Sequence, residues 1–472
     1  MNDKMLPEES SSMEPDQPLK IPSNSKKRNW PILILIMLTI FLISICTAAI
    51  ILIVRKRNED KNSPSTKYSS SFLYLNDIHL DATYVETSTP KSGCRSIVAE
   101  QVEKFKFGQY QCDSPNKLYN SLIENATKLI DPPDFIVLGG DLIAHGLHPT
   151  KQMLIDNFNS ITKPLEKQFP NTKIYITLGN NDYQKNYGSF DTDLTDFENA
   201  FEVFGKWMNT EQAETFKKGG YYHADFPSSH FRFLFLNTVI YSRKRTYNET
   251  LTDPYGQFAW IRNMYKDGVQ KGYKIGIALH IPPGVVYYDN KVGWNIQYIN
   301  TFADIMKECD FSFIISGHSH TDMILPLYTP NNDNDGILYS LSAPSVSPAH
   351  YNNPGFRNYL MDQGIIKDFI QYYADIMLNP SELNWEIEYK FSEAYKTKDI
   401  TRNSINDAVK WIRSTGEGQW RYRERVYSRA DQHNSFYYCT LRALLPEDVN
   451  KCAKQNGAEA LSFQPYHHSV NL

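Results

Sequence analysis

Seven residues with side chains suited to binding metal ions each follow a short apolar run in this chain of 472 residues. In chain order they are Asp77, His79, Asp141, Asn180, His280, His318 and His320. In open α/β sheets the ligand crevice lies outside the carboxyl ends of the strands, so we expect these side chains to converge on one place. A lone histidine after a strand, or a single "GD" turn, would be ordinary structural chemistry. Seven such groups in one chain predict a functional site.

The mixture of ligand types indicates a pair of metal ions that act on a phosphoryl group. Two divalent ions about 3.5–4 Å apart need a bridging carboxylate, and they hold a hydroxide and a phosphoryl oxygen between them. Imidazole and carboxylate ligands suit zinc, iron or manganese. Cysteine is absent from the set, which argues against a structural zinc finger.

Short β-prone runs must position these residues. Five of the runs end at candidate ligands, namely residues 71–77, 134–141, 173–180, 273–280 and 311–318. Helix-like stretches such as 114–130 separate several of them, and strands that alternate with helices predict an α/β domain. The runs "YYHADF" and "FRFLFLNT" flank "PSSH" and predict a hairpin. Later strands are expected in "GILYSLSAPS" and "WEIEYKF", and the pattern turns helical and charged from about residue 392.

The ordered series D-x-H, G-D, G-N-x-D, H and G-H-x-H resembles the calcineurin-like metallophosphoesterases over roughly residues 71–322. The resemblance implies a β-sandwich of mixed sheets flanked by helices, with two bound divalent ions, of which Zn²⁺ is favoured. It implies one ion held by Asp77, His79, Asp141 and His320. It implies a second ion held by Asp141, Asn180, His280 and His318, so that Asp141 bridges.

Finer features resemble the acid sphingomyelinase-like phosphodiesterase branch. They are the segments "NDIHLDATY" and "SAPSVSPAHYNNPGFRNYLMD" and the histidine four residues after the bridging aspartate in "GGDLIAH". A cysteine-bearing segment at 94–112 and a cysteine-bearing helical C-terminus also match. The resemblance implies that His145 is an active-site histidine able to act as an acid.

Asn181 in "GNND" departs from the family pattern, because most members have a histidine there that stabilises or protonates the leaving group. Such a role contributes about 10²–10⁴-fold. Asparagine donates a hydrogen bond but delivers no proton at neutral pH. We interpret Asn181 as a catalytic position with a shifted substrate or acid, His145 being the remaining acid. The structural alternative is that Asn181 orients Asn180 or packs beside the metal.

The sequence therefore predicts a binuclear phosphodiesterase or phosphohydrolase. A metal-bound hydroxide would attack phosphorus of a phosphodiester or phosphoanhydride in a small phosphodiester, nucleotide, phospholipid or polyphosphate. An endopolyphosphatase is the alternative, since "GNND" also resembles the vacuolar endopolyphosphatases. A second alternative is a non-catalytic binding ectodomain that keeps the metals as structure.

Other polar and aromatic residues have no motif that assigns them a role. Five histidines are interpreted as surface or core residues, namely His148, His223, His350, His467 and His468. Pocket shape is expected to depend on loops such as 182–220 and 284–298. Their aromatic residues are interpreted first as packing, namely Tyr183, Tyr187, Tyr287, Tyr288 and Trp294.

The net charge is −4, from 49 basic and 53 acidic residues. This balance provides no broad positive field of the kind that nucleic-acid-binding proteins carry. Nucleic acid is therefore not expected as a structural partner.

An uncharged apolar run over 31–54 predicts a transmembrane signal anchor. At about 1.5 Å per residue such a helix reaches roughly 36 Å, enough to cross a bilayer core of ~30 Å. A signal peptide would have a shorter apolar region of about 7–15 residues. We expect the remaining chain to divide into a disordered cytosolic tail (1–30), a linker (55–70), a catalytic domain (71–391) and a helical region (392–472).

Basic clusters flank both ends of the apolar run, so the positive-inside rule does not decide its orientation. The pairs Cys94 with Cys112 and Cys439 with Cys452 suit disulfides in an oxidising compartment, and Cys309 is left as a buried thiol. Glycosylation sequons begin at Asn125 and Asn248. Together these features predict a type II protein with its catalytic domain extracellular or in a vacuole-like or lysosome-like lumen.

Overall fold

The computed structural model describes residues 35, 37–41, 47, 68–98, 104–246, 250–286, 291–328, 336–379, 381–430 and 437–455. The chain divides into two compact units, Met1–Lys67 and Tyr68–Leu472. In the first unit the described residues are helical, and most of the predicted anchor at 31–54 lies outside the described residues. Among the residues that are described, no helix has the length and apolar character needed to cross a membrane.

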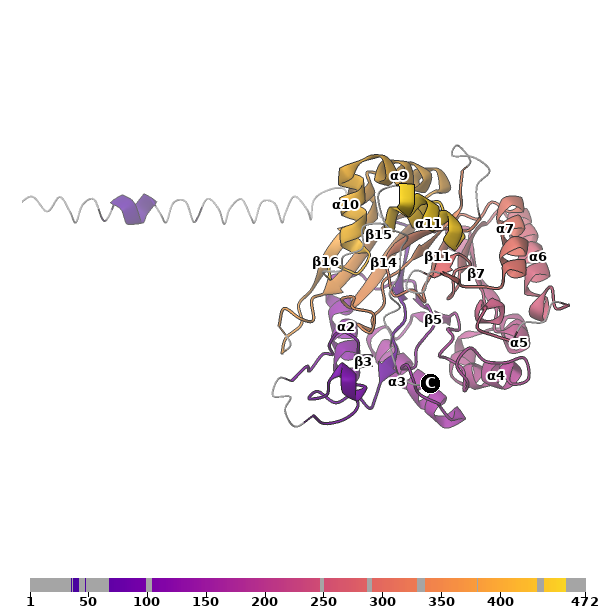
Figure 1. Ribbon diagram of the computed structural model, residues 1–472, viewed down its shortest axis with the longest axis horizontal. Helices are drawn as coiled ribbons and strands as arrows, with labels where there is room; N and C mark the ends of the chain where they lie inside the picture. The colour runs from indigo at the N-terminus through magenta and orange to yellow at the C-terminus, as the bar shows by residue number, and fades with distance from the viewer. Residues whose placement is uncertain are drawn as a thin grey trace, which may run out of the picture. The chain divides into compact units, whose positions relative to one another are not determined.

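The second unit contains two six-stranded sheets, drawn in Figure 1. The first has the spatial order β16 (Trp385–Lys390), β15 (Ile365–Ala374), β14 (Gly355–Asp362), β1 (Ser70–Leu75), β4 (Phe135–Leu138) and β5 (Lys173–Ile176). The second has the order β12 (Met323–Pro326), β13 (Tyr339–Ser342), β11 (Phe313–Ser316), β8 (Lys274–Ala278), β7 (Phe231–Phe235) and β6 (Tyr222–Phe226). Two short pairs join β2 (Leu80–Asp81) to β3 (Ser114–Pro115) and β9 (Val285–Val286) to β10 (Lys291–Val292).

Both sheets are mixed. In the first sheet β1, β4 and β5 are parallel, while β14, β15 and β16 extend the sheet in antiparallel fashion. In the second sheet β7, β8, β11 and β13 are parallel and the edge strands β6 and β12 are antiparallel. The predicted α/β fold of mixed sheets and the predicted hairpin, formed by β6 and β7, are confirmed.

Aromatic side chains form the core between the sheets. Phe72 on β1 stacks on Phe135 of β4 with ring centroids 5.0 Å apart. It also meets Phe233 of β7 at 5.7 Å and Phe313 of β11 at 6.5 Å, which links the two sheets. Such pairs contribute about 0.5–1.5 kcal/mol beyond the burial of their area. The alternation of strand residues thus places one aromatic face of each sheet against the other.

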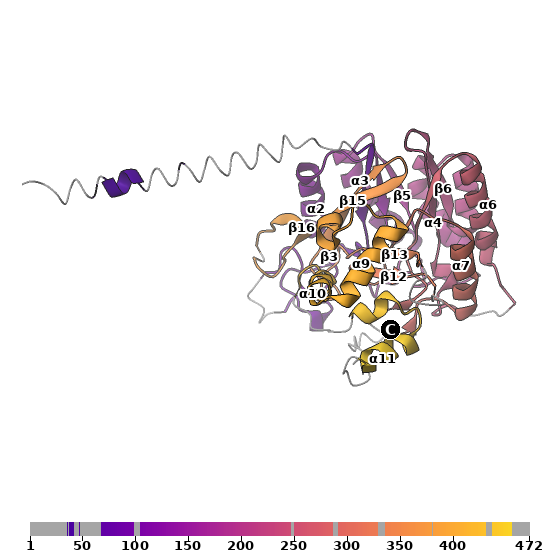
Figure 2. The same cartoon turned by 90° about the horizontal axis from the view of Figure 1, so that it is seen from above.

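Helices cover the sheets. They are α2 (Asn116–Leu129), α3 (Lys151–Gln168), α4 (Asp193–Phe204), α5 (Thr210–Gly219), α6 (Gln257–Gln270) and α7 (Ile296–Glu308). Figures 1 and 2 both show α6 and α7 side by side beside the second sheet. The Tyr119 hydroxyl on α2 donates to the Ile161 carbonyl on α3, at 2.9 Å, and fixes that pair beside the first sheet.

The expectation of a loop over 182–220 is wrong for most of that segment, because α4 and α5 occupy it. Asn209 caps α5, and its side chain accepts from the backbone N–H of Gln212 in a capping box. Three of the predicted packing aromatics, Tyr183, Tyr187 and Trp294, are buried. Tyr287 and Tyr288 lie outside the described residues.

The C-terminal region is helical, as predicted for the part that the structure describes. Its elements are α8 (Phe391–Tyr395), α9 (Arg402–Ser414), α10 (Gly416–Arg425), a 3-10 turn (Tyr437–Leu441) and α11 (Pro446–Gln455). Asn406 on α9 donates to the Ile337 carbonyl at 2.7 Å and accepts from the Ile337 N–H at 3.0 Å. The Tyr422 hydroxyl accepts from the N–H of Ile324 on β12 at 3.0 Å. These bonds dock α9 and α10 beside the second sheet.

Both predicted disulfides are present, Cys94–Cys112 and Cys439–Cys452, and Cys309 is a buried free thiol. Disulfides of this kind are typical of extracellular or lumenal proteins.

Candidate active site

Strand register brings the ends of the central strands to one level. In the first sheet Leu75 of β1 lies opposite Leu138 of β4, which lies opposite Ile176 of β5. In the second sheet Ala278 of β8 lies opposite Ile315 of β11. The candidate ligands follow these strands by two to four residues, so each sheet delivers its own set to the same edge.

The predicted aspartates and histidines come together there. Their ligand atoms form three overlapping groups. Within each group, all the ligand atoms lie within 4.8 Å of one another. The groups are Asp77, His79 and Asp141; Asp141, His280 and His318; and His79, His145 and His320. Asp141 Oδ2 lies 3.4 Å from His280 Nε2 and 3.6 Å from His79 Nε2. Its carboxylate is therefore placed between the two halves of the cluster.

Five of the seven candidate ligands have a left-handed backbone conformation. Their φ angles are 46° for Asp77, 42° for His79, 53° for Asp141, 69° for His318 and 58° for His320. A residue with a side chain loses about 1–3 kcal/mol in such a conformation unless its surroundings hold it. The N–H of Asp77 donates to the Gly140 carbonyl at 3.2 Å, and that of His79 donates to the Asp141 carbonyl at 3.0 Å. This concentration of strain is characteristic of a functional site.

Two glycines allow the chain segments to approach closely. A Cβ on Gly140 would lie 2.6 Å from the backbone nitrogen of Gly179, and a Cβ on Gly179 would lie 2.1 Å from that of Asp141. Neither clash is relieved by moving a side chain, because both involve backbone atoms. The glycines in "GGD" and "GNND" are therefore required by packing as well as by turn geometry.

Asp182, the last residue of "GNND", organises this contact, a role that the sequence interpretation missed. Its buried carboxylate accepts from the backbone N–H groups of Asp141 at 2.8 Å, Leu142 at 2.7 Å and Gly179 at 2.8 Å. It thereby joins the loop after β4 to the loop after β5. The signal was available, since the motif that predicted Asn180 also ends in this aspartate.

Hydrogen bonds fix which ring nitrogen two of the histidines present. The Ile143 carbonyl accepts from His79 Nδ1 at 3.0 Å, and the Gly139 carbonyl accepts from His280 Nδ1 at 2.8 Å. Each Nε2 is therefore the atom offered to the centre. Burial lowers the pKa of His79 to about 4 and holds the pKa of His318 and His320 well below its usual value. Neutral imidazole is the form that binds a metal.

The charges near His280 raise the pKa of its ring, whereas the pKa values of His79, His318 and His320 are lowered. Burial acts to lower the pKa of His280, but the carboxylates of Asp141 and Asp77 raise the pKa to about 9. Burial also raises the pKa of Asp77 to about 7. Buried carboxylates that raise the pKa of a neighbouring ring indicate that this centre favours positive charge, which a divalent ion supplies.

Three buried ligand atoms lack a hydrogen-bond partner among the described residues. They are Asp77 Oδ1, Asn180 Oδ1 and His280 Nε2. Each buried polar atom left without a partner costs about 1–3 kcal/mol. Their concentration at one place, with oxygen and imidazole nitrogen donors only, fits divalent cations such as zinc, iron or manganese.

His145 lies at the accessible side of this cluster. Its ring stacks on that of His79 with centroids 3.8 Å apart, and its side chain is 38% exposed. Its Nδ1 donates to Asp113 Oδ1 at 2.8 Å, and its backbone N–H donates to Asp113 Oδ2 at 2.7 Å. Desolvation acts to lower the pKa of His145, but the charge of Asp113 raises it overall. An oriented, protonatable ring beside the metal ligands is suited to act as an acid.

Asp113 and Arg95, which the sequence interpretation missed, hold His145 in place. Arg95 Nη2 donates to the His145 carbonyl at 2.8 Å, and Arg95 Nε donates to Asp81 Oδ2 at 2.8 Å. Arg95 directly follows Cys94, and Asp113 directly follows Cys112, so the first disulfide joins the two segments that carry them.

We expect the double variant Cys94→Ser/Cys112→Ser to lose about 3 kcal/mol in free energy of unfolding, as a loop of this length predicts. Its turnover should fall as well, since Asp113 and Arg95 would be less well held, whereas its metal content should stay normal. Denaturant unfolding, steady-state kinetics and elemental analysis measure the three quantities. Cys439→Ser/Cys452→Ser opens a loop of similar length and is the matched control, with a similar loss of stability and normal turnover. Equal turnover in the two variants would contradict a positioning role for the first disulfide.

Asn181 contacts the central carboxylate. Its backbone N–H donates to Asp141 Oδ1, and its side-chain amide donates to Asp141 Oδ2, both at 2.8 Å. Asn181 is buried. These contacts favour the alternative that Asn181 packs beside the metal centre, and they identify Asp141 as the group that it orients.

The remaining histidines and the two sequon asparagines lie in different parts of the chain. His350, for which the sequence predicts only a surface or core place, lies against the cluster with its ring 4.3 Å from that of His320 and 5.9 Å from that of His145. His148 is exposed, His223 is buried on β6, and residues 467 and 468 lie outside the described residues. Asn125 lies within α2, where its side chain donates to the Ser121 carbonyl at 2.8 Å, and Asn248 lies outside the described residues.

Comparison with known proteins agrees with this geometry. The family model described as calcineurin-like phosphoesterase matches residues 70–322. Human acid sphingomyelinase-like phosphodiesterase 3b is 28% identical over 433 residues, which cover 84% of this chain and 92% of the relative. Sphingomyelinase phosphodiesterase C of Dictyostelium discoideum is 29% identical over 378 residues, covering 73% and 82%. Human cyclic GMP-AMP phosphodiesterase SMPDL3A is 27% identical over 362 residues, covering 72% and 78%.

The family match covers more than half of the chain and includes all seven candidate ligands. The chain therefore belongs to the calcineurin-like phosphoesterase family, is similar to its acid sphingomyelinase-like phosphodiesterases, and is a metal-dependent phosphoric ester hydrolase.

Proposed function

We propose that the chain is a binuclear phosphodiesterase or phosphohydrolase that cleaves a small phosphodiester or a phosphoanhydride. The observation that carries the proposal is the cluster of buried ligand atoms around Asp141, three of which lack a hydrogen-bond partner among the described residues. Asp77, His79, Asp141 and His320 would hold one ion. Asp141, Asn180, His280 and His318 would hold the other.

Two such ions, when bound, activate a water molecule and neutralise charge on the phosphoryl oxygens. The protein supplies the remaining groups. Asp141 lies between the two ligand sets, and both amide donors of Asn181 hold its carboxylate in place. The backbone carbonyls that accept from His79 and His280 direct each Nε2 toward the centre.

His145 is the acid in this proposal. Asp113 accepts from Nδ1, so Nε2 is the atom from which a proton passes to the leaving oxygen. The exposed part of the ring faces solvent, where a substrate enters, whereas the ring of His79 covers one of its faces. His145 therefore combines access to substrate with a fixed orientation, as general-acid catalysis requires.

A substrate panel tests the proposal. We expect purified full-length protein to hydrolyse bis(p-nitrophenyl) phosphate, and to lose that activity to a chelator and regain it with a divalent metal. Parallel assays with cyclic GMP-AMP, sphingomyelin vesicles and inorganic tripolyphosphate distinguish a phosphodiesterase from an endopolyphosphatase. A metal-loaded protein that turns over none of these substrates would instead be the non-catalytic binding ectodomain.

We further propose a type II anchor at residues 31–54, with the catalytic region extracellular or lumenal. Support comes from the apolar run and the two disulfides. Endoglycosidase treatment of protein from its native host is expected to increase its mobility on a gel. Protease added to intact vesicles is expected to trim only the N-terminal tail. Digestion of the catalytic region in that assay would reverse the proposed topology.

A further inference from the structure

A buried carboxyl group without a hydrogen-bond partner lies where the C-terminal helices meet the first sheet. Glu388 is 4% exposed, and neither of its carboxyl oxygens has a hydrogen-bond partner among the described residues. Figures 1 and 2 both show α10 beside β16, the strand that carries Glu388. A carboxyl buried in this way costs free energy, and it costs more as a carboxylate than as a neutral acid. Glu388 is not among the metal ligands, so its burial needs another explanation.

A β-bulge turns Glu388 inward. Ile387 lies opposite Tyr372 and Tyr389 lies opposite Gln371, so Glu388 is an extra residue between two consecutive pairs of the ladder. In a regular strand the neighbour of a buried residue points to the opposite face of the sheet. Glu388 and Tyr389 are instead both buried. Bulges re-aim side chains in this way and are frequent next to functional sites.

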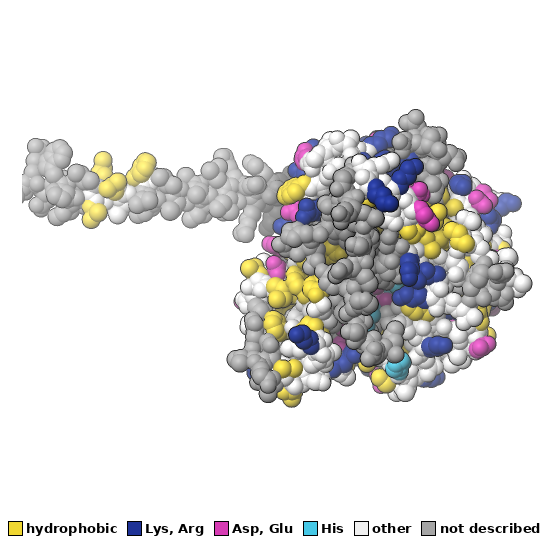
Figure 3. Space-filling view, viewed as in Figure 1, with side chains coloured by type: hydrophobic (Ala, Val, Ile, Leu, Met, Phe, Trp, Pro, Cys, Tyr) yellow, Lys and Arg dark blue, Asp and Glu magenta, His cyan; other side chains and the backbone are white. Residues whose placement is uncertain are grey.

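Charged and titratable groups of several neighbouring segments face the Glu388 carboxyl. They are Asp322 before β12, Arg357 on β14, Tyr389 on β16, Tyr395 on α8, Arg425 at the end of α10 and Arg429 after it. Figure 3 shows Lys and Arg side chains at the surface where α9 lies in Figure 1, whereas Arg357 and Arg425 are buried. Arg357 Nη2 pairs with Asp322 Oδ2 at 2.7 Å, and the Arg425 guanidinium lies 4.8 Å from the centroid of the Tyr389 ring. Both buried cations are therefore engaged with groups other than Glu388.

Ionisation of Glu388 would disturb this arrangement. Burial raises the pKa of Glu388 to about 8, the charge of Asp322 acts in the same direction, and the nearby arginines act against both. A carboxylate in this place would need a hydrogen-bond donor. Arg425 Nε is a buried donor without a hydrogen-bond partner among the described residues. We therefore expect ionisation to draw the Arg425 guanidinium away from the Tyr389 ring and toward Glu388.

Arg425 begins a segment, residues 425–429, that holds two loops of the candidate active site. The Val426 carbonyl accepts from the N–H of Asp322 at 2.9 Å, and Asp322 follows the proposed ligand His320 by two residues. The Tyr427 carbonyl accepts from the N–H of Asn353 at 3.2 Å. The carbonyl of the next residue accepts from the Asn353 side-chain amide at 3.0 Å. A movement of Arg425 would therefore be transmitted to backbone contacts beside the metal centre.

The 425–429 segment keeps its shape only through its surroundings. Ser428 and Arg429 are consecutive residues in the left-handed conformation, with φ angles of 47° and 62°. Each such residue costs about 1–3 kcal/mol unless neighbouring structure holds it. Arg429 Nη2 donates to the Glu388 carbonyl at 3.0 Å, and its guanidinium lies 5.3 Å from the centroid of the Tyr373 ring. The strained turn is thus held by the same part of β16 that buries Glu388.

We propose that Glu388 is a pH-sensitive switch for the 425–429 segment, in which the neutral acid keeps the segment docked on β16 and on the two active-site loops, and ionisation releases it. The direction follows from linkage. The folded chain holds the Glu388 proton to a higher pH than the unfolded chain, because the pKa rises from 4.5 to about 8 on folding. The stabilisation is complete below the lower value and is lost as the pH rises to the higher one. Within that window this one group makes unfolding more favourable by up to about tenfold per pH unit.

Melting temperatures of purified full-length protein test the switch. Between about pH 5 and pH 8 we expect the wild type to lose about 5 °C more than Glu388→Gln, which keeps the shape of the side chain but has no proton to release. Glu388→Met removes the polar atoms at similar volume and should show the same flatter response, whether or not the glutamine amide finds partners. Glu386→Gln is the matched control on the same strand, since Glu386 is exposed and accepts from the Tyr373 hydroxyl at 2.8 Å. Its profile should follow that of the wild type.

Hydrogen exchange at a single pH locates the effect. At about pH 8 the amides of residues 425–429 should exchange at least about tenfold faster in the wild type than in Glu388→Gln, because local opening sets their exchange rate. Parallel melting profiles for the wild type and both Glu388 variants would overturn the inference. Divergent profiles with equal exchange in the 425–429 segment would overturn it as well, since Glu388 would then act elsewhere. None of these measurements requires turnover, so either failure would leave the proposed function standing.

Discussion

Replacing Asp141 with asparagine is expected to lower turnover by on the order of 10³-fold, because this carboxylate alone belongs to both halves of the ligand cluster. A pair of ions contributes several kcal/mol of charge stabilisation, and each 1.36 kcal/mol corresponds to about tenfold in rate. Asparagine keeps the shape of the side chain but removes its charge. Steady-state hydrolysis of bis(p-nitrophenyl) phosphate, with metal content determined on the same sample, measures the effect.

Asp77→Asn is the matched variant, since Asp77 is also a buried carboxylate but belongs to only one of the two proposed ligand sets. Its loss of turnover should be smaller and should be restored in part by excess metal. An Asp141→Asn protein with near-normal turnover and two bound ions would contradict the binuclear assignment.

Removing the His145 ring is expected to slow substrates with poor leaving groups by about 10²–10⁴-fold. An activated aryl leaving group needs little protonation, so His145→Ala should slow bis(p-nitrophenyl) phosphate far less. Parallel kinetics on an alkyl phosphodiester and on the aryl diester measure the difference. Asp113→Asn should act in the same direction with a smaller effect, because Asp113 orients His145 without reaching the substrate.

Metal content separates this role from a structural one. His145→Ala should retain its metal, because the ring stacks on His79 but is not among the proposed ligands. Asn181→His should partly restore the activity of His145→Ala if that position can carry an acid. Equal losses on both leaving groups, together with loss of metal, would make His145 a structural residue.

Local patterns made much of this architecture predictable. An apolar run that ends in a polar ligand is visible within eight residues, as in 134–141, where β4 leads to Asp141. Parallel strands then bring such ends together without further information, since their register is shared. The same reasoning missed α4, although Phe197, Ala200 and Phe204 show helical spacing there and are buried.

Features that depend on distant segments were not predictable in this way. Asp113 reaches His145 from 32 positions earlier in the chain, and a disulfide holds its segment in place. His350 reaches His320 only because the chain after β13 returns to the site. The left-handed conformations of Asp77 and His318 reflect surrounding packing, because neither residue type favours φ > 0 strongly enough to be read from the sequence.

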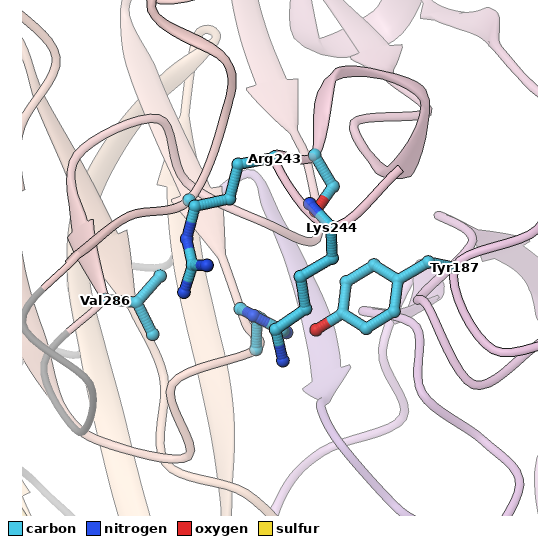
Figure 4. Close-up of a pocket in the computed structure, with 7 residues that line it drawn as sticks. Tyr187, Arg243, Lys244 and Val286 are labelled. Carbon is cyan, nitrogen blue, oxygen red and sulfur yellow. The ribbon is translucent and has the colours of Figure 1, made fainter. Parts of the chain in front are cut away.

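The two cations beside His318 were likewise hidden, since "SRKR" read alone is a basic turn. Arg245 pairs with the buried Asp193, and Arg243 and Lys244 line a pocket that includes His318 (Figure 4). That division is set by tertiary contacts alone.

The number of metal ions bound per chain tests the central claim most directly. Purified full-length protein would be stripped with a chelator, titrated with Zn²⁺, Mn²⁺ or Fe²⁺, and followed by elemental analysis and by hydrolysis of bis(p-nitrophenyl) phosphate in the same samples. We predict two ions per chain at saturation, with full turnover reached only when both are bound. Full turnover at one ion per chain, or in chelated protein that holds none, would contradict a binuclear centre built around Asp141.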